Sequence, residues 1–186
     1  MGKVSSKQRI SKYISYLLRH NPESIGLVLD KNGWAHINDI IELSGPDGLT
    51  REQIETAAIP TDKKRFVIEG DRIRALHGHS IKVDLGLDPT VPPLILYHGT
   101  ATRNLDAIMG KHVEGIQGEG LKPMTRDLVH MSADHTTAYK TGKRHGNPIV
   151  LTISALQMHK DGYILFQSAN GVWLTNGVPR KYLATY

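Results

Sequence analysis

The segment DLGLDPTVPP, residues 84–93, breaks this chain of 186 residues into two parts. Its ten residues include three prolines and one glycine, and no other stretch changes composition so sharply. Because proline fixes φ and removes a backbone hydrogen-bond donor, we expect the segment to run extended. We therefore predict a linker over 84–93 between an N-terminal unit, 1–83, and a C-terminal unit, 94–186.

The N-terminal unit reads as three helices followed by a β-hairpin. Apolar residues at helical spacing mark the helices, and the capping box of Thr50 and Gln53 opens the third. The expected elements are helices between 6 and 21, over 37–43 and over 51–58, then strands over 66–68 and 73–75. This is the order of a winged-helix domain, a common nucleic-acid-binding scaffold that also serves as a plain interaction module.

The C-terminal unit is richer in expected strands. Apolar and β-branched runs predict strands over 94–98, 128–132, 148–153, 163–166 and 171–175. Helices are expected over 104–109 and, after the N-cap Asp134, up to 144. We expect a curved sheet in this unit, and the α+β class for the whole chain.

The composition excludes several chemistries. The chain has no cysteine, so disulfides, a thiolate nucleophile, iron–sulfur clusters and cysteine-based zinc sites are ruled out. A metal site would need the ten histidines and the carboxylates. The pair His77 and His79 has no carboxylates close by in the sequence, so we expect surface polar residues there and no metal site.

The charge balance favours an anionic partner. The 23 Lys and Arg residues exceed the 18 Asp and Glu residues, which gives a formal net charge of +5. No apolar run is long enough to span a bilayer, and the first residues lack the apolar core of a secretory signal. We expect a cytoplasmic protein that does not enter membranes, and no obligate protein partner is evident.

Several short motifs carry residues suited to chemistry. Arg19 and His20 close the first helix, where cations also suit the helix dipole. Arg74 lies on a predicted strand, and Arg126 precedes another. The segment YHGT, residues 97–100, ends a strand at Gly99, where a ligand could approach the backbone. The Rossmann, P-loop and G-x-S-x-G patterns are absent.

Taken together and in order, five segments resemble the RNA 2′-phosphotransferases of the tRNA-splicing type, the KptA family. They are YISYLLRHNPESIGLVLDKNGW, IRALHGHS, LYHGT, RDLVHMSAD and NGVWLT, and the resemblance runs from about Tyr13 to Leu183. It implies an N-terminal winged-helix lobe that binds RNA and a C-terminal lobe with the NAD-binding fold of ADP-ribosyltransferases.

The resemblance also implies a two-step reaction that consumes NAD as a co-substrate. An internal RNA 2′-phosphate attacks the nicotinamide ribose and expels nicotinamide. The ribose 2″-hydroxyl then attacks the phosphorus, which frees 2′-hydroxyl RNA and ADP-ribose 1″,2″-cyclic phosphate. By this resemblance the catalytic residues are Arg19, His20, Arg74 and Arg126. Arginine suits such a role because its guanidinium binds phosphate bidentately.

The residues implied in holding NAD are His98, Gly99 and Thr100 on one strand and His130 and Ser132 on another. Two positions depart from the pattern of relatives. His77 stands where they often have glutamine, and Asp127 stands where a neutral or basic residue is more usual.

Two other functions remain open at this point. One is an ADP-ribosyltransferase that modifies nucleic-acid ends or protein and stops at the adduct. The other is a non-enzymatic winged-helix protein that binds nucleic acid and has a vestigial NAD lobe. Arg74 and Arg126 argue against the second, because binding alone does not need them beside an HGT motif.

Overall fold

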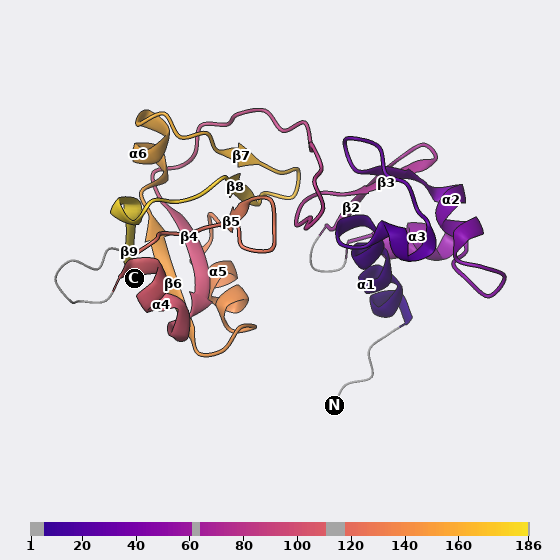
Figure 1. Ribbon diagram of the computed structural model, residues 1–186, viewed down its shortest axis with the longest axis horizontal. Coiled ribbons are helices and arrows are strands. Elements are labelled where there is room, and N and C mark those ends of the chain that lie inside the picture. Colours follow the sequence, from indigo (N-terminus) through magenta and orange to yellow (C-terminus); the bar gives the residue numbers. More distant parts are fainter. Residues whose placement is uncertain (1–5, 61–63, 111–117, 186) are drawn as a thin grey trace. The chain divides into compact units, whose positions relative to one another are not determined.

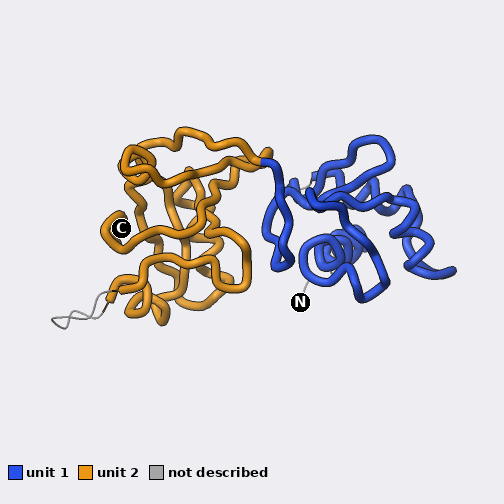
Figure 2. The backbone as a smooth tube through the Cα atoms, turned by 45° about the horizontal axis from the view of Figure 1, so that its top comes forward, with its two compact units in different colours: residues 1–86 blue, residues 87–186 orange. Residues whose placement is uncertain are grey.

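The computed structural model describes residues 6–60, 64–110 and 118–185 of the chain. Two compact units divide it: unit 1 is Met1–Gly86 and unit 2 is Leu87–Tyr186 (Figure 2). The boundary falls inside the expected linker. The N–H of Asp84 donates to the carbonyl of Lys31 at 2.9 Å in unit 1, and the N–H of Thr90 donates to Leu165 at 2.8 Å in unit 2. Backbone groups of the segment 84–93 are thus bonded to the units themselves.

Unit 1 combines three helices with one small sheet (Figure 1). In chain order its elements are α1 (Ser6–Arg19), the short 3-10 helix η1 (Pro22–Ile25), β1 (Trp34–His36), α2 (Ile37–Leu43), α3 (Arg51–Ala58), β2 (Phe66–Glu69) and β3 (Arg72–Ala75). The antiparallel sheet has the order β1-β3-β2. The predicted helices and hairpin are confirmed, and β1 is an additional strand.

The core of unit 1 forms where α1 turns its apolar face inward. Ile14, Leu17 and Leu18 are fully buried and share one core cluster with residues of α2, α3 and the sheet. The capping box is present, since the Thr50 side chain accepts from the N–H of Gln53 at 3.3 Å. The outer face of α1 stays exposed.

Unit 2 contains two antiparallel sheets and three α-helices within its described residues (Figure 1). Its elements are β4 (Leu96–Ala101), η2 (Thr102–Asn104), α4 (Leu105–Met109), β5 (Val129–Met131), α5 (His135–Gly142), β6 (Pro148–Ile153), α6 (Ala155–Lys160), β7 (Phe166–Gln167), β8 (Trp173–Thr175), η3 (Arg180–Tyr182) and β9 (Leu183–Thr185). The sheet orders are β4-β6-β9 and β5-β8-β7.

The single curved sheet expected for unit 2 is therefore replaced by two short ones. The strand β5 has three residues and pairs with β8. The chain just after it pairs with β4 through an isolated bridge between Tyr97 and Ser132, whose N–H and C=O groups exchange bonds of 2.8 and 2.9 Å. The molecule is α+β in class, and the helix α6 and strand β9 are elements beyond those expected.

None of the helices in the described part of the chain combines the length and the apolar character needed to cross a membrane.

Candidate functional site

In unit 1, the end of α1 is fastened to a loop that follows β3. The N–H of Ser80 donates to the carbonyl of Arg19 at 2.8 Å. The Ser80 hydroxyl lies 2.9 Å from Nδ1 of His20 and 3.4 Å from the same Arg19 carbonyl. One serine thus contacts both members of the Arg19-His20 pair. The hydroxyl at Nδ1 orients the imidazole ring of His20 and leaves Nε2 as its other polar atom.

Arg74 on β3 is held over an aromatic ring. Its guanidinium carbon lies 4.7 Å from the centre of the Trp34 ring, and its Nη1 donates to the carbonyl of Leu85 at 3.3 Å. Such a cation–π contact fixes the plane of the side chain. The Nε of Arg74 is buried and has no hydrogen-bond partner among the residues that the structure describes.

His79 directly precedes Ser80, and the expectation of a surface position for it is wrong. Its side chain is 3% exposed. That expectation rested on the lack of carboxylates close by in the sequence, which argues against a metal site but does not indicate how deeply the side chain is buried. Burial, followed by the charges of Arg19, His20 and Arg74, lowers the pKa of His79 to about 4.

His79 is therefore neutral at pH 7 and lies within electrostatic reach of all three unit 1 residues that the resemblance implies are catalytic. Its buried Nε2 has no hydrogen-bond partner within the described ranges. Sequence reasoning missed this residue as part of the site. The available signal was its place in IRALHGHS, directly before Ser80.

In unit 2, His98 on β4 has a defined tautomer. Its Nδ1 lies 2.9 Å from the carbonyl oxygen of His130 on β5. Burial lowers the pKa of His98, and the charges of Arg126 and His145 lower it further against the opposing effect of that hydrogen bond. The imidazole is thus neutral at pH 7. Since a carbonyl only accepts, Nδ1 carries the proton and Nε2 is an acceptor.

The other side chains implied in holding NAD make contacts within unit 2. The Thr100 hydroxyl accepts from Nδ2 of Asn104 at 3.1 Å, and the Ser132 hydroxyl accepts from the N–H of Asp134 at 3.0 Å. Nδ1 of His130 donates to the carbonyl of Leu128 at 3.0 Å. These bonds fix the rotamers of the three residues.

Gly99 has a different reason for being glycine than the one expected. A Cβ built at this position would overlap the carbonyl oxygen of Ala138 in α5 and lie 2.9 Å from the backbone nitrogen of Gly142. The missing side chain makes room for the helix that covers β4. The requirement for glycine therefore comes from packing within the fold, which needs no ligand to explain it.

Arg126 belongs to unit 2, whereas Arg19, His20 and Arg74 belong to unit 1. Its N–H donates to the carbonyl of Pro123 at 3.2 Å, in the loop before β5. Burial lowers the pKa of Arg126, and its charge acts on His98. Each unit thus holds part of the expected catalytic set. Unit 1 contains the arginines and the histidine expected to bind the phosphate, and unit 2 contains Arg126, whose charge acts on His98.

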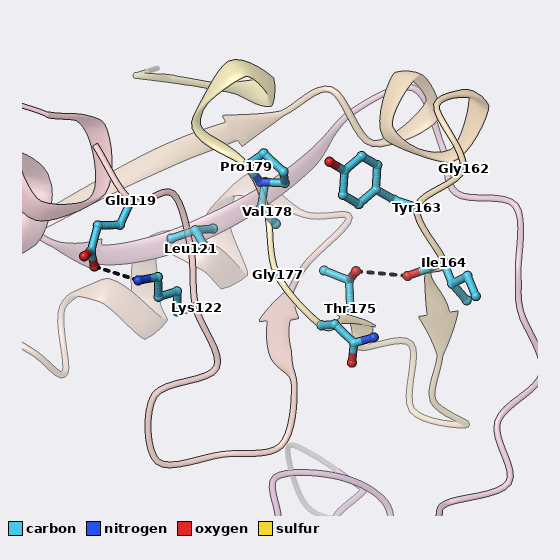
Figure 3. A pocket seen from close by; sticks show the side chains of 11 residues that line it. Glu119, Leu121, Lys122, Gly162, Tyr163, Ile164, Thr175, Gly177, Val178 and Pro179 are labelled. Atoms are coloured by element: carbon cyan, nitrogen blue, oxygen red, sulfur yellow. Dashed lines mark hydrogen bonds and ion pairs between the residues drawn. The ribbon is translucent and has the colours of Figure 1, made fainter. Parts of the chain in front are cut away.

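A pocket of about 580 Å³ opens elsewhere on unit 2 (Figure 3). A Glu119–Lys122 ion pair of 3.1 Å and the 2.9 Å bond from Thr175 Oγ1 to the Ile164 carbonyl lie in its wall. None of the expected site residues lines this pocket. Across residues 6–60, 64–110 and 118–185, no group of three or more His, Asp or Glu side chains could hold a metal ion.

The arrangement defines a class of protein. Guanidinium groups beside histidine form charge-assisted hydrogen bonds to phosphate, so an α+β protein with these sites is suited to phosphate-bearing substrates. A family model described as "RNA 2'-phosphotransferase, Tpt1 / KptA family" matches residues 5–177. The chain belongs to this RNA 2′-phosphotransferase family.

Curated relatives agree with this assignment. A protein of Streptomyces coelicolor is 47% identical over 177 residues, which cover 94% of this chain and 93% of the relative. One of Pectobacterium carotovorum is 49% identical over 179 residues, 94% of this chain and 92% of its own. One of Agrobacterium fabrum is 49% identical over 177 residues, which cover 93% of this chain and 91% of the relative. Each is named "Probable RNA 2'-phosphotransferase".

Proposed function

We propose that this protein removes an internal 2′-phosphate from RNA in a reaction that consumes NAD. RNA 2′-phosphate and NAD are converted to 2′-hydroxyl RNA, nicotinamide and ADP-ribose 1″,2″-cyclic phosphate. Family membership supports an RNA substrate and transfer of its 2′-phosphate. The observation that carries the proposal is that Ser80 contacts both Arg19 and His20, while the adjacent buried His79 lies within electrostatic reach of Arg19, His20 and Arg74.

The unit 1 group has the properties that a phosphate dianion requires. Arg19 and Arg74 supply guanidinium donors, and Arg74 is already oriented by Trp34. The low pKa of His79 keeps a further positive charge from forming beside the group, and its imidazole can still accept or donate one hydrogen bond. His20, with Nδ1 at Ser80, can use its other nitrogen to orient the phosphate or to move a proton. Arg126 completes the proposed catalytic set.

NAD would supply an ADP-ribosyl group with nicotinamide as the leaving group. The unit 2 residues suit NAD in the charge that they place near it. The nicotinamide ring of NAD is positively charged, and a neutral His98 does not repel it as a protonated one would. We propose that His98, Gly99, Thr100, His130 and Ser132 hold NAD, with Gly99 contributing through its backbone.

The finer fold assignment is part of the same proposal. The order of helices and hairpin in unit 1, with its β1-β3-β2 sheet, supports a winged-helix lobe that binds RNA. The small antiparallel sheets of unit 2 support an ADP-ribosyltransferase-like lobe. We also propose a cytoplasmic site of action, where RNA and NAD are both available.

Product analysis tests the proposal against its rivals. The protein is incubated with a 2′-phosphorylated oligoribonucleotide, with and without NAD, and the masses of the RNA and of the small products are measured. We expect NAD-dependent loss of the phosphate and release of nicotinamide. A stable ADP-ribosyl adduct on the RNA would favour the ADP-ribosyltransferase, and unchanged RNA would favour a binding protein.

A further inference from the structure

The outward face of α1 is a basic and aromatic stripe. Its exposed residues are Arg9, Lys12, Tyr13 and Tyr16, and the next position on the same face is the exposed His20. The spacing of three or four residues places them in line along one side of the helix. With a rise of about 1.5 Å per residue, the stripe extends roughly 16 Å from Arg9 to His20. We call these residues the α1 stripe.

The two tyrosines of the stripe have no role in the core. Tyr13 is 38% exposed and Tyr16 is 45% exposed, whereas Ile14 and Leu17, one position further along, are fully buried. The Tyr16 hydroxyl accepts from Nδ2 of Asn21 at 2.8 Å, which fixes the ring. The centre of the Tyr16 ring lies 6.4 Å from the centre of the His20 ring. A fixed, exposed aromatic ring therefore stands next to a proposed catalytic residue.

The charge of the helix has one sign. Its sequence SKQRISKYISYLLR contains Lys and Arg but neither Asp nor Glu. In the described part of unit 1, ion pairs form elsewhere, on Arg51 and Arg72. Within the described residues Arg9 and Lys12 have no carboxylate partner. Basic side chains interleaved with exposed aromatic rings match single-stranded nucleic acid, because cations track the phosphates while bases stack on the rings.

We propose that the α1 stripe binds the single-stranded RNA that flanks the 2′-phosphate, with bases stacked on Tyr13 and Tyr16 and phosphates paired with Arg9 and Lys12. The inference rests on the proposed function for its substrate. It adds the direction in which the strand runs from the phosphate site, toward the N-terminal end of α1. It also makes RNA length, in addition to the 2′-phosphate, a determinant of affinity.

Two substrates separate this role from catalysis. One is a 2′-phosphorylated dinucleotide, and the other carries the same dinucleotide within a longer single strand. We expect the full-length wild type to have a lower KM for the longer RNA. Replacing both Tyr13 and Tyr16 by Ala should raise that KM by about 30-fold or more, the scale of two base–aromatic stacks, while kcat changes little. A matched control is Tyr139→Ala, since Tyr139 is 44% exposed on α5.

A second variant tests the charges without touching an aromatic ring. Replacing Arg9 and Lys12 by Ala should make the slope of log K against log salt less negative by about 0.7 for each lost phosphate contact. The probe is a fluorescent single-stranded RNA without a 2′-phosphate, measured by anisotropy. Circular dichroism and the melting temperature establish that each variant is folded.

The binding measurement also separates this proposal from the proposed function. If the wild type transfers no 2′-phosphate but the tyrosine and charge variants bind the RNA more weakly, the α1 stripe stands and the proposed reaction does not. If the KM ratio of long to short substrate and the affinity for plain RNA are both unchanged in folded variants, the stripe does not bind RNA.

Discussion

A single residue, His79, couples the charge of the unit 1 site to the stability of the protein. Its pKa is about 4 in the folded protein, against an ordinary value of 6.5 for a histidine in the unfolded chain. Between these pH values the unfolded chain binds a proton at this position and the folded chain does not. The free energy of unfolding therefore falls as the pH drops from 6.5 toward 4, by at most about 1.4 kcal/mol per pH unit from this group.

We predict that His79→Gln removes this contribution. Chemical denaturation of wild type and variant at several pH values between 4 and 6.5 gives the difference in unfolding free energy. The wild type should lose stability relative to the variant as the pH falls. Parallel curves for the two proteins would show that His79 titrates normally and is not held neutral in the folded state.

Ser80 is the residue that orients His20, so its hydroxyl should matter for turnover. Ser80→Ala removes the 2.9 Å contact to Nδ1 of His20, and we predict a fall in kcat of roughly 3- to 10-fold with little change in KM. Ser80→Thr retains a hydroxyl and should recover most of the loss. The matched control is Ser44→Ala, which removes another serine hydroxyl bonded to a backbone carbonyl in unit 1.

The assays are steady-state kinetics on 2′-phosphorylated RNA and the pH dependence of kcat. An unchanged kcat in the Ala variant would mean that Ser80 acts only through its backbone bond to Arg19, which alanine retains. A loss in the Thr variant equal to that in the Ala variant would contradict a role for the hydroxyl.

At the scale of elements, the contact between β4 and α5 depends on a missing side chain. Because a Cβ at Gly99 would overlap the carbonyl of Ala138, Gly99→Ala must move the helix off the strand. Overpacking usually destabilises by about 1–3 kcal/mol, and we predict the upper end or more because the obstacle is backbone. Gly171→Ala is the control. Its Cβ would meet open space, so the only expected cost is that of an alanine at a φ of +80°.

Urea unfolding of the two variants checks this prediction. The control should lose about 1–2 kcal/mol, the value for an L residue in the left-handed region. A Gly99→Ala protein as stable as the control would mean that α5 can move off β4 without loss.

Elements with a local signature could be predicted from sequence. The capping box at Thr50 defined the start of α3, and the apolar run at Pro148–Ile153 coincides with β6. The strand β1 could not be predicted, because a strand of three residues is too short to show an alternating pattern. It also pairs with a distant segment, since Trp34 lies opposite Arg74 in the sheet. The burial of His79 was missed because the absence of nearby carboxylates in the sequence argues only against a metal site. The depth of the side chain, which is 3% exposed, is set by tertiary packing.

The candidate site was predictable only in part. The residues of Arg19-His20 and YHGT stood out by their motifs. The partners that hold them, Ser80 for His20 and the His130 carbonyl for His98, lie 60 and 32 residues away. No local pattern encodes such contacts, because tertiary structure alone brings them together.

At the scale of the whole molecule, the account needs no metal ion, because arginine side chains should neutralise the charge of the RNA 2′-phosphate. We therefore predict that turnover on 2′-phosphorylated RNA is the same in EDTA as in buffer with magnesium. The rate of phosphate loss from the RNA is the measurement. Loss of turnover in chelator that a divalent ion restores would contradict a reaction carried by guanidinium groups.

The fate of the 2′-phosphate itself distinguishes transfer from every other way of losing it. An oligoribonucleotide labelled with ³²P only at its internal 2′-phosphate is incubated with the protein and NAD, and the labelled products are separated. The proposed function predicts that the label leaves the RNA and appears in ADP-ribose 1″,2″-cyclic phosphate, and only when NAD is present. Label released as inorganic phosphate, or retained on the RNA in an ADP-ribosyl adduct, would contradict it.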